Sequence, residues 1–253
     1  MKKHLKSILA TTIILSGIGV GQLIALADTV TTEGEITFTI DAGESIPTHP
    51  DIPDTVDPGA PEDGEIGNVD GLLRIDYVSN FRFGTHDLNL QTGGIFNAHP
   101  QMWAEEETAT APFIQVTDIR GTQLGWRLDV AQTGGQFSNN DSIMLTGAQL
   151  RLSNLRIYNT VHDLPNSTIP LPDIPTGIIN LDPGGEAVTI STAGANVGMG
   201  TSHIVFGTLT TIGEPPVTTA PGVQLVIPPY AISGGTTDLN FTTELTWTLS
   251  NTP

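Results

Sequence analysis

Few side chains in this sequence have the types and spacing that catalysis or metal binding requires. Beyond position 4 the histidines are scattered without metal-ligand spacing; they are His49, His86, His99, His162 and His203. There is no G-x-S-x-G, H-E-x-x-H or phosphate-binding loop. Any two of the 27 acidic residues could converge as a glycoside-hydrolysing pair, but nothing singles a pair out. We therefore expect no catalytic site, no metal site and no cofactor.

An acidic, proline-rich segment over 41–68 is the one place that suggests calcium. Its carboxylates include Asp51, Asp54, Asp57, Glu62, Asp63 and Glu65. The D-x-[DN]-x-[DN]-G loop with its distal glutamate is missing, and prolines hold the carboxylates apart. Between a calcium site and a solvated linker, we favour an extended, self-repelling linker.

Composition excludes several other classes. The chain has no cysteine, no lysine after Lys6 and a formal net charge of −18. Disulfide-stapled domains, zinc fingers, thiol enzymes and lipoproteins all need cysteine. Electrostatic binding to nucleic acid needs a basic patch, which this excess of acid does not favour.

The first 27 residues have the pattern of a secretory signal peptide. MKKHLK is a positive start, 7–24 are apolar and small, and Ala25-Leu26-Ala27 fits the cleavage rule. The competing interpretation is an uncleaved membrane anchor, which Gly17, Gly19 and Gly21 make weak. Cleavage removes the three lysines and takes the net charge from −18 to −21. We expect a secreted protein with no further membrane span.

From residue 69 onward, apolar residues recur with period two, and no window shows helical periodicity. The runs begin with Leu73, Ile75 and Tyr77, continue with Leu124, Trp126, Leu128 and Val130, and end with Leu245, Trp247 and Leu249. Glycine and proline clusters separate them. The prediction is one all-β domain over 28–253, an antiparallel sandwich or open barrel. It has an early strand at 34–40, the acidic segment 41–68 and a β-core over 69–253. The proline-rich stretch 159–186 should be a surface loop.

Two of these strands share a tripeptide. Trp126-Arg127-Leu128 and Trp247-Thr248-Leu249 each put a tryptophan and a leucine on one strand face, and Val116 to Gly121 precede the first copy. In an exported, acidic, cysteine-free β protein this arrangement resembles the WxL-domain family of Gram-positive surface proteins, and in particular its small members. The resemblance covers essentially the whole mature chain.

The resemblance implies a non-enzymatic surface protein that attaches non-covalently to the cell wall, with peptidoglycan as the usual proposed ligand. It implies assembly with a membrane-anchored WxL-interacting protein containing a DUF916 domain, with larger WxL proteins, and a role in adhesion. The binding motif falls on Trp126, Leu128, Trp247 and Leu249, and its supporting residues fall on Asp118, Arg120, Gly121 and Gly125.

The residues leave open how the motif acts. The tryptophans are either buried anchors that shape a binding face, or at least one ring is exposed and stacks on a ligand. Asp118 and Arg120 are expected to form a structural ion pair near the Gly121 turn. The alternative function is a structural subunit that a membrane-anchored partner holds at the surface. A third, an exported carbohydrate-active enzyme, has the least support.

Overall fold

The computed structural model describes residues 35–36, 46–51, 60–67, 71–104, 108–213, 216–232 and 239–251. In this part of the chain the regular structure consists of β-strands, β1 to β15, without a helix. The predicted all-β class is confirmed. The predicted signal peptide lies outside the described residues, as does the predicted strand 34–40 apart from Glu35 and Ile36.

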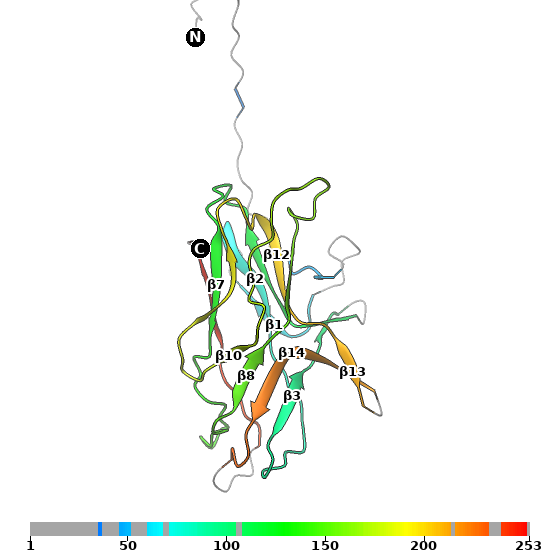
Figure 1. Cartoon of the computed structure of the whole chain (residues 1–253), viewed down its shortest axis with the longest axis vertical. Helices are drawn as coiled ribbons and strands as arrows, with labels where there is room; N and C mark the ends of the chain where they lie inside the picture. The colour runs from blue at the N-terminus through cyan, green and yellow to red at the C-terminus, as the bar shows by residue number, and fades with distance from the viewer. Residues whose placement is uncertain are drawn as a thin grey trace, which may run out of the picture. The chain divides into compact units, whose positions relative to one another are not determined.

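One face of the domain is a five-stranded antiparallel sheet (Figure 1). Its strands, in spatial order, are β1 (Gly64–Ile66), β2 (Leu73–Ser79), β6 (Phe113–Asp118), β12 (Gly200–Phe206) and β9 (Leu155–Asn159). Neighbouring strands come from distant parts of the sequence, since β6 pairs with both β2 and β12. The sheet therefore depends on non-local pairing.

Two further sheets pack against its inner face. The first has the order β10 (Ile179–Leu181), β8 (Gln149–Leu152), β14 (Val217–Ile227) and β13 (Thr210–Ile212), with β3 (Gly94–Ala98) also on β14. The second has the order β11 (Val188–Ala193), β7 (Trp126–Ala131) and β15 (Thr246–Ser250). A short pair joins β4 (Gln101–Met102) to β5 (Ala109–Thr110). The result is a sandwich-like arrangement rather than a closed barrel.

The two faces of the five-stranded sheet carry two separate cores. Ile114 and Ile204 belong to the main core, with Leu128 of β7 and Leu150 of β8. Phe113, which precedes Ile114, and Val205, which follows Ile204, face the other way. They pack with Tyr77 and Trp103 in a smaller core. Alternation along a strand places consecutive residues on opposite faces, so β6 and β12 are apolar on both.

The prediction that Leu73, Ile75 and Tyr77 share one face is wrong for Tyr77. The register of β2 against β6 shifts between Ile75 and Tyr77, which is a bulge. An extra residue in one strand reverses which side chains point inward beyond it. Leu73 and Ile75 therefore pack on the main core, while Tyr77 packs in the smaller one. Burial raises the pKa of the Tyr77 hydroxyl well above its usual value.

Two other local expectations also change. Leu124 was expected to share the buried face of Trp126, but it is 59% exposed and β7 begins only at Trp126. The stretch 159–186 is mostly loop, as expected, but it includes β10 at the edge of its sheet. An edge position is where a proline-rich stretch can still supply a short strand.

The acidic segment differs more from its prediction. Residues 46–51 do not form a solvated linker, because Pro47, His49 and Pro50 are buried. They lie across the outer face of the five-stranded sheet, where the backbone amide of Thr48 donates to the side chain of Gln115 on β6 at 2.8 Å. Outward-facing polar side chains on the sheet supply the contacts that the sequence pattern did not reveal.

Candidate wall-binding site

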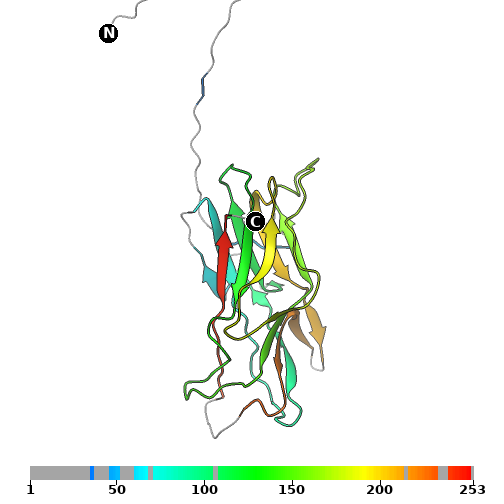
Figure 2. The ribbon, with the colours of Figure 1, turned by 60° about the vertical axis from the view of Figure 1, so that its left-hand side comes forward.

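The two tryptophan motifs lie side by side. β15 pairs antiparallel with β7, so that Trp247 stands opposite Val130 and Leu249 stands directly opposite Leu128. Figure 2 shows β15, in red, beside β7 at the edge of the three-stranded sheet. Two tripeptides that are far apart in the sequence thus form one continuous patch of a single sheet.

The first motif is part of the core. Trp126 and Leu128 have no exposed surface. The indole Nε1 of Trp126 donates to the carbonyl of Gly198 at 3.0 Å. Gly198 has a φ of +75°, and an added Cβ would lie 2.6 Å from that nitrogen. Trp126 and Leu128 are therefore buried anchors, as one of the two interpretations expected, and they cannot touch a ligand directly.

The second motif is only half-buried. Trp247 makes an edge-on contact with Phe81, with ring centroids 6.5 Å apart, and a tilted contact with Phe206 at 6.1 Å. Leu249 packs beside it against the main core. Trp247 and Leu249 are therefore the motif side chains that a ligand can reach.

Both line a large open cleft between β15 and β2. Its volume is about 1770 Å³. Leu73 and Ile75 of β2 form one wall, and Phe81 and Phe83 follow on the adjoining loop. Leu245, Trp247 and Leu249 come from the other side. Clefts lined by apolar and aromatic side chains with a few polar groups are where ligands commonly bind.

Polar groups stand at the margin of this apolar cleft. Arg82 lines it and forms a largely exposed ion pair with Asp63 at 2.7 Å. The hydrogen bond from Arg82 lowers the pKa of the Asp63 carboxyl. Asn80, Asn240 and Glu244 also line the cleft. The cleft thus combines aromatic side chains with hydrogen-bonding groups.

The predicted supporting residues act on β7 rather than on the cleft. Arg120 reaches the two carboxylate oxygens of Asp118 at 2.8 and 2.9 Å and donates to the carbonyl of Gly125 at 2.7 Å. The Asp118 hydrogen bond raises the pKa of Arg120. The predicted ion pair is present, and it holds the residue directly before Trp126.

The glycines of this support differ from each other. Gly125 has a φ of +81°, and a Cβ there would lie 2.0 Å from the carbonyl oxygen of Ala193. Gly121 also has a positive φ, +68°, but a Cβ there would meet nothing within 4 Å. Gly125 is therefore required by both backbone conformation and space, whereas Gly121 serves the turn alone.

The sequence analysis missed the rings that complete the cleft. Phe81 contacts both Trp247 and Phe206, at 6.5 and 5.5 Å between ring centroids. Phe81 and Phe83 lie outside both tryptophan motifs. Their spacing was a usable signal, since it places two aromatic side chains on one side of an extended segment directly after β2.

Within the described ranges, no group of three or more histidine, aspartate or glutamate side chains is placed to hold a metal ion. No helix suited to crossing a membrane is found among the described residues.

These features define an all-β surface-binding module, with one motif in its core and the other along an open cleft. A family model described as "WxL domain surface cell wall-binding" matches residues 25–253. The chain belongs to the WxL family and carries a cell wall-binding surface domain across essentially its whole length. No curated protein and no solved structure matches it.

Proposed function

We propose that this is a secreted, non-enzymatic surface protein that binds peptidoglycan non-covalently and takes part in a surface adhesion complex. The observation that carries the proposal is the half-buried ring of Trp247 on an open aromatic cleft, in a domain of a wall-binding family. Trp247 and Leu249 contact the ligand. Trp126 and Leu128 hold β7 in place, with the support of Asp118, Arg120, Gly121 and Gly125.

The chemistry of the cleft fits an uncharged part of the wall polymer. The chain carries a formal net charge of −18, so long-range attraction to phosphate-rich wall components is unfavourable. Binding must instead come from short-range contacts. Phe81 and Trp247 offer apolar ring surface to sugar faces, and the polar margin offers hydrogen bonds to hydroxyl and amide groups.

The direct test is retention of the mature protein, 28–253, on purified protein-free peptidoglycan sacculi. We expect wild-type protein to be retained and Trp247→Ala to lose about 5- to 150-fold in affinity, because a stacked ring contributes on the order of 1–3 kcal/mol. Tyr230→Ala is the matched control, since Tyr230 is 70% exposed and lies outside the cleft lining. Circular dichroism must show that both variants are folded. Equal retention of the two variants would contradict a site at Trp247.

A second candidate is a structural subunit without direct wall binding, held by a membrane-anchored WxL-interacting protein of the DUF916 type. The position of β15 favours it. β15 pairs with β7 on one side, and no described strand pairs with its other edge. A sheet edge without a described partner strand, beside an apolar cleft, can accept a strand from a partner protein. If folded wild-type protein is not retained on sacculi, this candidate replaces the first.

An exported carbohydrate-active enzyme is the remaining alternative, and the same sacculi test its action on the wall. We expect no release of soluble glycan fragments during prolonged incubation with the mature protein. Release that scales with protein concentration would contradict a pure binding role.

A further inference from the structure

Residues 46–51 form a strap over the outer face of the five-stranded sheet, away from the cleft. The strap contains two residues that precede proline, Ile46 and His49, and such residues favour extended backbone. It is therefore partly ordered before it docks. Pro47, His49 and Pro50 are buried against the domain, while Ile46 and Asp51 are exposed.

The strap is held largely by side chains of the sheet. The side-chain amide of Gln115 forms two hydrogen bonds with the strap backbone. It donates to the Ile46 carbonyl at 3.1 Å and accepts from the Thr48 amide at 2.8 Å. The hydroxyl of Thr48 lies 2.8 Å from Nε2 of His203 on β12. These contacts resemble one rung of a β-ladder made by a side chain instead of a strand.

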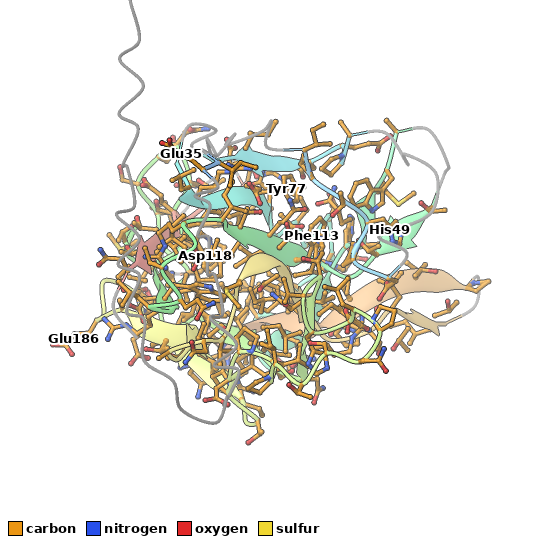
Figure 3. The ribbon with its side chains drawn as sticks, turned by 90° about the horizontal axis from the view of Figure 1, so that it is seen from above. Glu35, His49, Tyr77, Phe113, Asp118 and Glu186 are labelled. Atoms are coloured by element: carbon orange, nitrogen blue, oxygen red, sulfur yellow. The ribbon has the colours of Figure 1, made fainter. Side chains whose placement is uncertain are left out.

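Ring and charge contacts secure the rest of the strap. The His49 ring lies 5.2 Å from the ring of Trp103, which in turn stacks on Phe113 at 5.7 Å. Asp51 pairs with Arg156 of β9 at 3.3 Å. Figure 3 labels His49, Phe113 and Tyr77, which belong to the strap, β6 and β2.

Beneath the strap lies a buried polar cluster, which is unusual for a sheet face. Asp76 has no exposed surface, and His203 is 1% exposed. Asp76 accepts hydrogen bonds from Gln115 at 3.0 Å, from Thr117 at 2.5 Å and from Arg74 at 2.7 Å. Gln115 thus connects the buried carboxylate to the strap. Buried polar groups are stable only when they keep such partners.

We propose that residues 46–51 are an acid-released strap, closed at neutral pH and detached in moderate acid while the two β-cores stay folded. The titratable groups near His203 are Asp76 of β2, His49 and Asp51 of the strap, and Tyr158, its neighbour on β9. Arg74 pairs with Asp76, and Arg156 pairs with Asp51. His203 touches the strap directly through Thr48, so a charge on its ring is created at the strap contact itself.

The direction of the pH effect follows from burial. Burial lowers the pKa of His203 from 6.5 to about 4, and it outweighs the Thr48 hydrogen bond and the Asp76 and Asp51 charges, which raise the pKa. The buried ring beneath the closed strap therefore disfavours protonation. Its closure is fully stable above pH 6.5, where the released form is also neutral, and weakens as the pH falls from 6.5 towards about 4. The ratio of released to closed strap should rise by up to about tenfold for each pH unit in that interval.

The test is amide hydrogen exchange of Thr48 in the mature protein, followed by NMR from about pH 7.5 to about pH 4 and corrected for intrinsic exchange rates. Emission of Trp103 gives a second measure, because a detached His49 ring exposes an indole that is now 1% exposed. We expect Thr48 protection to fall by up to about 300-fold over the interval, with amides of β6 and β12 unchanged.

Two variants separate a titrating contact from a merely structural one. His203→Gln keeps a neutral polar side chain at all pH values, so the slope with pH should vanish. Thr48→Val removes the hydroxyl without changing charge, so release should rise equally at every pH with the slope preserved. Protection of Thr48 that does not change down to about pH 4, or that falls only with the β6 and β12 amides, would overturn the proposal. A full slope in folded His203→Gln would overturn it as well.

Discussion

At the scale of single residues, two tryptophans of the same motif have different roles. Trp126 is fully buried and its indole nitrogen is bonded to Gly198, whereas Trp247 is half-buried on the cleft. The difference comes from position, because β7 is the central strand of its sheet and β15 is an edge strand. A ring on a central strand is covered from both sides.

We therefore expect opposite phenotypes. Trp126→Ala should lower the free energy of unfolding by about 3–5 kcal/mol, the usual cost of emptying a buried aromatic site. Trp247→Ala should lower the free energy of unfolding less than Trp126→Ala does, but it should weaken wall binding more. Urea unfolding of both variants, beside the sacculi assay, measures the two effects. A larger stability loss for Trp247→Ala than for Trp126→Ala would contradict the assignment.

Gly198 gives a second prediction at this scale, with Gly121 as its matched control. Both have positive φ, +75° and +68°, but only at Gly198 would a Cβ collide with neighbours, the Ala193 side chain and the Trp126 ring. Gly121→Ala should cost about 1–2 kcal/mol for backbone conformation alone. Gly198→Ala should cost clearly more, and Trp126 should lose its hydrogen bond. Comparable unfolding midpoints for the two variants would argue against the steric role.

At the scale of elements, the Asp118–Arg120 pair determines where β7 begins. Arg120 bridges the end of β6 to the carbonyl of Gly125, directly before Trp126. The expectation that β7 would include Leu124 failed here, because Gly125 at φ +81° interrupts the extended backbone. Apolar periodicity indicates which residues can share a buried face. It does not indicate where a residue with positive φ interrupts the strand.

Removing this ion pair should therefore lower the free energy of unfolding more than removing an exposed ion pair. Arg120→Ala should lower the free energy of unfolding by about 1.5–3 kcal/mol, because it leaves the Asp118 carboxylate buried without its charged donor. Arg82→Ala is the matched control, since its pair with Asp63 is largely exposed and should contribute below about 1 kcal/mol. Thermal unfolding of both variants is the measurement, and equal losses would refute a special role for Arg120.

The sequence pattern predicted strands more reliably than their faces. Alternation located β2 and β15, because apolar spacing is a local property. It misplaced Tyr77, because the bulge in β2 depends on the register against β6. It also did not reveal that Arg74 and Asp76, which alternate with Leu73 and Ile75, are themselves buried. Asp76 is bonded to Gln115 and Thr117 of β6, which are distant in sequence.

At the scale of the whole molecule, charge limits how the protein reaches the wall. The nine basic residues are outnumbered by 27 acidic ones, and signal cleavage would remove three of the nine. Attraction to an anionic polymer is therefore not available at long range. Added salt screens repulsion beyond about 10 Å at 0.1 M and leaves short-range contacts in place.

Retention on sacculi should accordingly be constant or improve when salt rises from about 0.02 M to about 0.2 M. The measurement is a binding isotherm of the mature protein at each salt concentration, with the Trp247→Ala variant as the baseline. A steep loss of binding with salt would point instead to a site built on arginines, around Arg151 and Arg156.

The β class, the acidic character and the two tryptophan motifs could be predicted from the sequence, because composition and alternation are local properties of the chain. Three facts came from the folded structure: the motifs share one sheet with Leu249 opposite Leu128, Trp247 lines a cleft with Phe81, and Gln115 joins residues 46–51 to a buried Asp76. Each of these facts joins segments that are far apart in sequence. Strand order, register and edge position arise from long-range pairing, which local periodicity does not encode.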